Sequence, residues 1–297
     1  MNQSIDKDDR ATHPKRRIKL ILSYSGAGFF GWQSQSAGTG IQDLLEKCLF
    51  TILREKIRVT AASRTDTGVH ADYQVVCFST VSSLAEFKIL RALNALLPST
   101  VRVRDASLLS EFTSSTNEKK VVEFHPIFSA KSKLYVYRIW RAVGEHQQIM
   151  PYVWHMTRPL DVSSLLTATE QFVGVHDFTS FCAADSSAKT KTRNVIGIHI
   201  RESGPLLEIW FHGEGFLKQM VRNIVGTLVA VGTGKLDVKS IPEIFLKFDR
   251  RAAPATAPAQ GLTLAYIFYE KPGSIEDLVK NSNCMYTVPL WGSWYDF

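Results

Sequence analysis

The stretch Ala62-Ser63-Arg64-Thr65-Asp66-Thr67-Gly68-Val69-His70-Ala71 is a polar loop between two apolar runs. Residues 57–62 predict a short strand before it, and residues 74–80, rich in β-branched and aromatic side chains, predict a second strand after it. A guanidinium two positions from a carboxylate lowers the pKa of that carboxyl, so we expect Asp66 beside Arg64 to be ionised. An ionised aspartate in a cleft can act as a nucleophile or a base. The alternative is a surface turn with an incidental ion pair.

Composition indicates a globular protein outside the membrane. Of the 297 residues, 45% are hydrophobic and 21% charged, and no run approaches the ~20 apolar residues of a membrane span. Residues 1–17 lack the apolar core of a signal peptide. A net charge of +7 favours a polyanionic partner, although a solvated basic surface is the alternative.

The cysteines indicate a reducing compartment. They are widely scattered, show no Cys-x-x-Cys spacing, and are Cys48, Cys77, Cys182 and Cys284. We therefore expect free thiols in a cytoplasmic protein, with neither a zinc site nor disulfides.

The first hundred residues alternate strand and helix patterns. Strands are predicted over 17–24, 57–62, 74–80 and 101–108, and helices over 42–54 and 84–97. The order strand–helix–strand–strand–helix–strand matches the ferredoxin-like split βαβ plan.

A literal G-x-G-x-x-G, Gly26 to Gly31, follows the first strand and suggests a dinucleotide site. In such a site the last glycine opens a helix whose N-terminus binds the pyrophosphate. Here residues 32–40 continue as a loop and the helical pattern begins only at Ile41. We therefore reject the dinucleotide interpretation.

A long strand is predicted over residues 129–140, with two different faces. Leu134, Val136 and Trp140 point one way and pack, whereas the other face carries Lys131, Lys133, Tyr135 and Tyr137. Cations interleaved with aromatic rings suit a nucleic-acid backbone and a stacked base. A half-solvated strand is the alternative.

The helix predicted over residues 215–231 is apolar around most of its circumference and should be buried. Gly215, Gln219, Arg222 and Gly226 share its remaining stripe. A buried guanidinium must be paired, so we infer that Arg222 faces Asp66, while Gly226 allows another backbone to approach. A snorkelling arginine that reaches solvent is the alternative.

The rest of the second half shows the same alternation of strand and helix patterns as the first hundred residues. A helix over 161–172, a hairpin around Ser203-Gly204-Pro205, a short helix over 241–248 and a closing strand over 261–269 are predicted. His176 and Asp177 have no supporting ligand spacing, and we assign them a capping or bracing role.

Seven blocks, in order, resemble the tRNA pseudouridine synthase A family over about residues 17–269. They are the loop RTDTGVHA, Tyr24-Ser25-Gly26 with Phe30-Gly31-Trp32-Gln33, residues 41–46, residues 128–137, His176-Asp177-Phe178, residues 220–226 and residues 257–262. The resemblance implies an α+β fold of two ferredoxin-like (RRM-like) halves. These join into a mixed, mainly antiparallel central sheet with helices packed on one face and a cleft on the other.

The resemblance covers two halves, an N-terminal half over 17–112 with the Asp loop and a C-terminal half over 113–270. Outside it, the sequence predicts a flexible arm over 1–16 and a tail over 271–297.

By resemblance, the polar residues of the motifs have roles in isomerising uridine to pseudouridine. Asp66 is the nucleophile, attacking either C1′ of the ribose or C6 of the base; Tyr135 stacks on the uracil, and Arg222 pairs with Asp66. Arg64 holds the RNA backbone and Leu262 keeps the pocket dry. Basic residues that are plausible backbone contacts are Lys131, Lys133 and Arg138.

The resemblance further implies a substrate and an assembly. The family modifies uridines 38 to 40 of the tRNA anticodon stem-loop as a homodimer, without metal or cofactor. A non-catalytic RNA-binding or chaperone module on the same scaffold is the alternative function. It would lack the carboxylate, which this chain has as Asp66.

Three positions depart from the family pattern. Ser63 stands where the family usually has glycine, Ser25 replaces the usual aspartate, and Ile127 replaces an arginine that is common before the Phe-Ser-Ala run. These changes bear on substrate range more than on chemistry, since Arg64, Asp66, Tyr135 and Arg222 are all present.

Overall fold

All strands in the part of the chain that the structure describes belong to one sheet of ten strands. The computed structural model describes residues 15–35, 38, 40–109, 123–144 and 147–285. Its strands are β1 (Arg16–Tyr24), β2 (Thr60–Ala61), β3 (His70–Thr80), β4 (Val101–Leu108), β5 (Ser132–Trp140), β6 (Trp154–His155), β7 (Gly174–Asp177), β8 (Thr192–Ser203), β9 (Leu206–Gly213) and β10 (Leu262–Phe268). Its α-helices are α1 (Ile41–Leu53), α2 (Glu86–Leu96), α3 (Val162–Glu170), α4 (Met220–Gly232), α5 (Ile241–Lys247) and α6 (Ile275–Met285).

The first half has the predicted ferredoxin-like plan. Chain order is β1, α1, β2, β3, α2, β4, and the strands lie in the order β4-β1-β3-β2, each antiparallel to its neighbour. The second half repeats this order as β10-β5-β9-β8, with β7 added at the edge. The α+β fold with a mainly antiparallel sheet is therefore confirmed.

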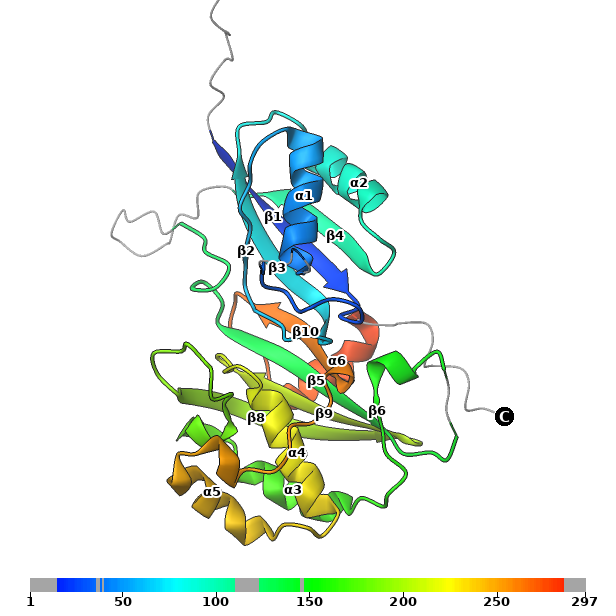
Figure 1. Cartoon of the computed structure of the whole chain (residues 1–297), viewed down its shortest axis with the longest axis vertical. Coiled ribbons are helices and arrows are strands. Elements are labelled where there is room, and N and C mark those ends of the chain that lie inside the picture. Colours follow the sequence, from blue (N-terminus) through cyan, green and yellow to red (C-terminus); the bar gives the residue numbers. More distant parts are fainter. Residues whose placement is uncertain (1–14, 36–37, 39, 110–122, 145–146, 286–297) are drawn as a thin grey trace, which may run out of the picture.

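The two halves meet at the end of the Asp66 loop. Strand β10 of the second half pairs in parallel with β3 of the first, in the register Thr263 with His70 and Leu264 with Ala71. Figure 1 shows β10 and β5 between the helices of the two halves. The loop that precedes β3 therefore lies at the junction of the two halves.

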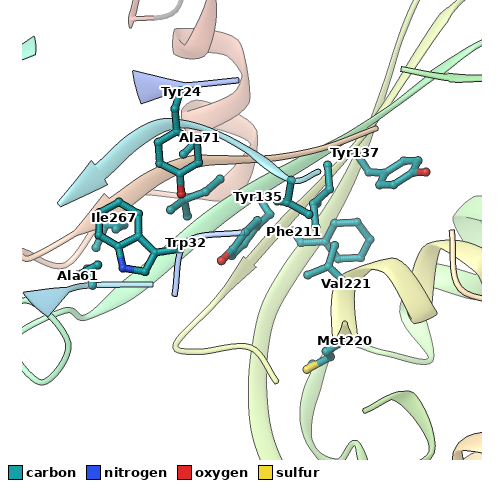
Figure 2. Close-up of a cluster of buried hydrophobic side chains, with 14 of the residues drawn as sticks. Tyr24, Trp32, Ala61, Ala71, Tyr135, Tyr137, Phe211, Met220, Val221 and Ile267 are labelled. Atoms are coloured by element: carbon teal, nitrogen blue, oxygen red, sulfur yellow. The ribbon is translucent and has the colours of Figure 1, made fainter. Parts of the chain in front are cut away.

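The main core lies on one face of the sheet. Residues of α1 to α5 belong to one cluster with the inward side chains of the strands, among them Tyr135 and Tyr137. Figure 2 shows Tyr135 within this cluster, with Trp32 on one side and Phe211 on the other. The opposite face of β5 carries Leu134 and Val136, which pack with Val279 of α6.

Two details differ from the expectation. Helix α6 covers the face opposite α4, so the first part of the predicted tail is a packed helix. The tyrosines on the other face of β5, Tyr135 and Tyr137, are also buried, in the cluster that includes α4, and Phe216 of the loop before α4 packs on Tyr135. The candidate site consequently lies on the helix-bearing face and not on the opposite one.

Boundaries follow from local chemistry. Helix α1 begins at Ile41 behind Gly40, as predicted. Helix α4 begins at Met220, later than the predicted residue 215, because Gln219 adopts a left-handed conformation with φ of 60°. The strand before the loop is only Thr60–Ala61, since just these residues pair with β3.

Some expectations fall on parts of the chain outside the described residues. These are the N-terminal arm up to residue 14, the polar connection over 110–120 and the aromatic end of the tail over 286–297. The arm's expected end differs, because Arg16 already belongs to β1. Within the described ranges, no helix combines the length and the apolar character needed to cross a bilayer.

Candidate active site

The Asp66 loop is held first by the segment that follows β1. The Trp32 amide donates to the Thr65 carbonyl at 3.0 Å, and the hydroxyls of Tyr24 and Thr65 share a hydrogen bond of 2.8 Å. Gly31 has φ of 84°, and a Cβ there would lie 2.7 Å from the Thr65 carbonyl oxygen. The glycines rejected as a dinucleotide motif therefore allow the loop to pack closely on this segment.

A buried glutamine holds the start of the loop. The side-chain amide of Gln74 donates to the Ser63 carbonyl at 2.7 Å and accepts from the Ser63 amide at 3.2 Å. Its nitrogen also lies 3.3 Å from the Tyr24 hydroxyl. Buried polar groups satisfied in this way specify one backbone conformation.

The carboxylate of Asp66 projects from a tight turn. The Val69 amide donates to the Asp66 carbonyl at 3.1 Å, and Gly68 has φ of 79°, a conformation that favours glycine. The Asp66 side chain is 22% exposed, so a substrate can reach it.

Arg222 approaches Asp66 from the first turn of α4. Its Nη1 lies 3.5 Å from Asp66 Oδ2, while its Nε donates to the Ala257 carbonyl at 2.8 Å. The segment that holds Ala257 packs tightly on α4, since a Cβ on Gly226 would lie 2.0 Å from the Ala255 carbonyl oxygen. The close approach expected at Gly226 is confirmed.

The electrostatic balance at Asp66 differs from the expectation. Burial raises the pKa of its carboxyl above the ordinary value, and the Arg222 guanidinium offsets only part of this effect. Arg64 is exposed, and the charges that act on the Asp66 carboxyl are those of Arg222, Lys218 and Asp185. The neighbouring charge thus comes from a distant part of the chain, 156 positions away, and not from the arginine in the same motif.

Tyr135 faces the same site from β5. Its ring packs edge-on against Phe216, with centroids 5.2 Å apart, and its hydroxyl shares a 2.8 Å hydrogen bond with Ser63 Oγ. Burial and the nearby Asp66 carboxylate raise the pKa of Tyr135 to about 12, so the phenol is neutral at physiological pH. It can therefore donate a hydrogen bond and offer its ring.

Leu262 and His70 close the junction. Leu262 begins β10 opposite Tyr137 and is buried. His70 accepts from the Gly26 amide at 3.0 Å and contacts the Gln260 carbonyl at 3.2 Å. Burial lowers the pKa of His70 to about 4, which fits a neutral ring that bridges the two halves.

The four predicted RNA-binding cations fall into two groups. Arg64 and Lys131 are exposed. Lys133 instead donates to the Ala62 carbonyl at 2.8 Å, and burial lowers its pKa to about 8. Arg138 lies on the other face of β5 and pairs with the buried Glu208 at 3.0 Å, so the structure does not bring it to Asp66.

This group combines a half-buried carboxylate, a fixed guanidinium and a neutral phenol ring. Such a set can stabilise positive charge at a sugar or attack an electrophilic carbon, while the ring retains a planar base.

Comparison with known proteins decides the family. A family model described as tRNA pseudouridine synthase matches residues 20–113 and 168–270. A tRNA pseudouridine synthase A of Geotalea uraniireducens is 39% identical over 254 residues, covering 86% of this chain and 100% of the relative. Relatives of the same name from Solidesulfovibrio magneticus and Bacillus licheniformis are each 41% identical, covering 86% of this chain and 92% and 99% of theirs.

The chain belongs to the tRNA pseudouridine synthase family. It is accordingly a pseudouridine synthase, an isomerase. A crystal structure of a Cbf5-Nop10-Gar1 complex shares 11% sequence identity over 89% of this chain and 54% of that chain, with a TM-score of 0.33, too distant a likeness to bear on function.

The pseudouridine synthase also has supporting residues that the sequence did not single out. Gln74, Tyr24 and His70 hold the loop without contributing to the predicted chemistry. The available signals were that Tyr24 and His70 lie in blocks that resemble the family, and that Gln74 is a polar residue directly before the apolar run of β3. The lack of a supporting ligand spacing led to a bracing role for His176, and its ring packs on Phe245 and contacts the Val173 carbonyl at 2.9 Å, in agreement with that role.

Proposed function

We propose that this enzyme isomerises uridine to pseudouridine at positions 38 to 40 of the tRNA anticodon stem-loop, with Asp66 as the nucleophile. The observation that supports this most is the convergence of Asp66, Arg222 and Tyr135 from three separate elements. We infer the tRNA substrate from the relatives, which are named tRNA pseudouridine synthase A.

The reaction breaks the bond between the base and the ribose, turns the base, and joins C5 to C1′. Asp66 attacks while Arg222 stabilises its ionised form. Tyr135 stacks on the detached uracil, and the buried Leu262 keeps water from the pocket. A uridine in a stem must first be flipped out, at a cost of a few kcal/mol. Contacts from exposed Arg64 and Lys131 to the RNA backbone offset this cost.

The assembly and location belong to the same proposal. The enzyme acts as a homodimer in the cytoplasm, with one tRNA contacting both subunits. Light scattering of the purified protein, alone and with tRNA, measures the mass of each species; a monomer in both samples contradicts the dimer.

The test is release of tritium from tRNA that carries 5-tritiated uridine, because forming the C5–C1′ bond expels the C5 hydrogen. Wild type is compared with Asp66→Asn and with Asp161→Asn. Asp161 is the exposed N-cap of α3, and asparagine caps a helix equally well, so this control should retain full activity.

Release by wild type and the control alone supports the proposal. Release by Asp66→Asn at a similar rate removes Asp66 from the role of nucleophile. No release by any protein that still binds tRNA favours a non-catalytic RNA-binding module. Sequencing of the modified positions after treatment tests positions 38 to 40.

A further inference from the structure

The phenol of Tyr135 has one hydrogen-bond partner among the described residues. Its oxygen lies 2.8 Å from Ser63 Oγ, and both side chains are buried. Because water has little access to this contact, the serine hydroxyl satisfies a group that would otherwise be unpaired.

The position of Ser63 is itself fixed on both sides. Gln74, which is fully buried, clamps the Ser63 amide and carbonyl, and the preceding carbonyl of Ala62 accepts from Lys133 Nζ at 2.8 Å. Lys133 and Tyr135 project from the same face of β5 and engage consecutive residues of the loop. The hydroxyl of Ser63 is therefore a fixed point relative to the strand that carries Tyr135.

The geometry of the Tyr135 ring explains why the Ser63 hydroxyl can fix its orientation. The Cβ end of Tyr135 is held by β5, and one side of the ring packs on Phe216 at an interplanar angle of 82°. The hydroxyl oxygen is the side-chain atom farthest from the backbone. A contact that fixes it therefore restricts tilting of the Tyr135 ring more than any contact nearer to Cβ does.

We propose that Ser63 is a positioning residue, whose hydroxyl holds the Tyr135 ring in the orientation that receives the target uracil. This inference rests on the proposed function, in which Tyr135 stacks on the base.

The test compares Ser63→Ala, which removes the hydroxyl, with Ser63→Thr, which keeps one. Single-turnover tritium release gives the chemical rate, and filter binding gives tRNA affinity. We expect Ser63→Ala to slow the chemical step about tenfold, the effect of one lost hydrogen bond of ordinary strength, with affinity within twofold of wild type. Ser63→Thr should recover most of the rate. Ser79→Ala, at an exposed serine of β3, is the matched control and should be unchanged.

A second readout does not depend on activity. In protein labelled with ¹³C at the tyrosine ζ carbon, the Tyr135 signal, assigned through Tyr135→Phe, should shift in Ser63→Ala and stay near its wild-type position in Ser63→Thr. An unchanged shift in Ser63→Ala shows that the hydrogen bond is absent in solution and overturns the inference.

Two kinetic outcomes separate this inference from the proposed function. An active wild type with an equally active Ser63→Ala overturns the inference alone, as does an equal loss in the alanine and threonine variants. A wild type that forms no pseudouridine in any tRNA overturns the proposed function, and the positioning role with it.

Discussion

Arg222 Nη1 lies 3.5 Å from Asp66 Oδ2, although the two residues are 156 positions apart and belong to different halves of the molecule. The arginine is 14% and the aspartate 22% exposed, so the pair is neither freely solvated nor sealed. The guanidinium is oriented by its second hydrogen bond, to the Ala257 carbonyl. The ionisation of Asp66 consequently depends on how the halves are joined.

Replacing Arg222 should move the acidic limb of the pH–rate profile. Burial already raises the pKa of Asp66, and Arg222 opposes this, so Arg222→Met should raise it further. The proposed attack by Asp66 requires the ionised form, so activity should be lost at a higher pH in Arg222→Met than in wild type. The measurement is kcat/KM for tritium release between pH 5 and 8.

A matched control for that profile is Arg141→Met, which breaks the surface pair of Arg141 with Glu202 at 2.7 Å. The acidic limb of its pH–rate profile should lie at the same pH as in wild type. An acidic limb that does not move in Arg222→Met would show that Arg222 does not govern the ionisation of Asp66.

Gly226→Ala should destabilise the fold and misplace Arg222. The new Cβ would lie 2.0 Å from the Ala255 carbonyl oxygen, so the segment that holds Ala257 must shift. We expect a loss of about 1–3 kcal/mol in the free energy of unfolding, as for other overpacking changes. Gly273→Ala, where nothing lies within 4 Å, is the control. Equal melting temperatures for both variants would contradict the close approach at Gly226.

The elements of this fold could be predicted because their apolar periodicity is local. The start of α1 at Ile41 and the hairpin of β8 and β9 are examples, since turn and cap residues mark them in the sequence. The start of α4 could not be placed, because the residue with the left-handed conformation before it is Gln219. A glycine there would have marked the position in the sequence.

The site was predicted less completely, and for a physical reason. Alternation along β5 separates Tyr135 from Leu134, but it cannot show that helices cover both faces of that strand. Lys133 and Arg138 look like RNA contacts in sequence, yet they have protein partners, Ala62 and Glu208, that lie far away along the chain. The net rise in the pKa of Asp66 likewise depends on burial, which a motif does not contain.

Lys131 and Lys133 should affect different kinetic constants, although they are two positions apart. Lys131 is exposed, so Lys131→Met should raise KM for tRNA and weaken the salt dependence of binding by about one charge. Lys133 anchors the Ala62 carbonyl, so Lys133→Met should lower kcat several-fold with KM little changed. Titration of tRNA affinity against salt, with single-turnover rates, distinguishes them. If both variants changed KM alone, the anchoring role of Lys133 would be wrong.

His70 should make stability fall in mild acid. Its pKa is about 4 in the folded protein, below the ordinary value of 6.5, because burial disfavours the charged ring. A group whose folded pKa is depressed favours the folded state above its unfolded pKa, and this contribution is lost as pH falls from about 6.5 toward 4. Protonation of Nδ1 would also break the hydrogen bond from the Gly26 amide, which ties the segment after β1 to the junction.

We therefore expect the melting temperature of wild type to drop between pH 7 and 5. The variant His70→Gln should have a lower melting temperature than wild type at pH 7, but its melting temperature should fall less on acidification. His199→Gln, outside this junction, should follow the wild-type curve. Parallel curves for wild type and His70→Gln would mean that other groups cause the acid sensitivity.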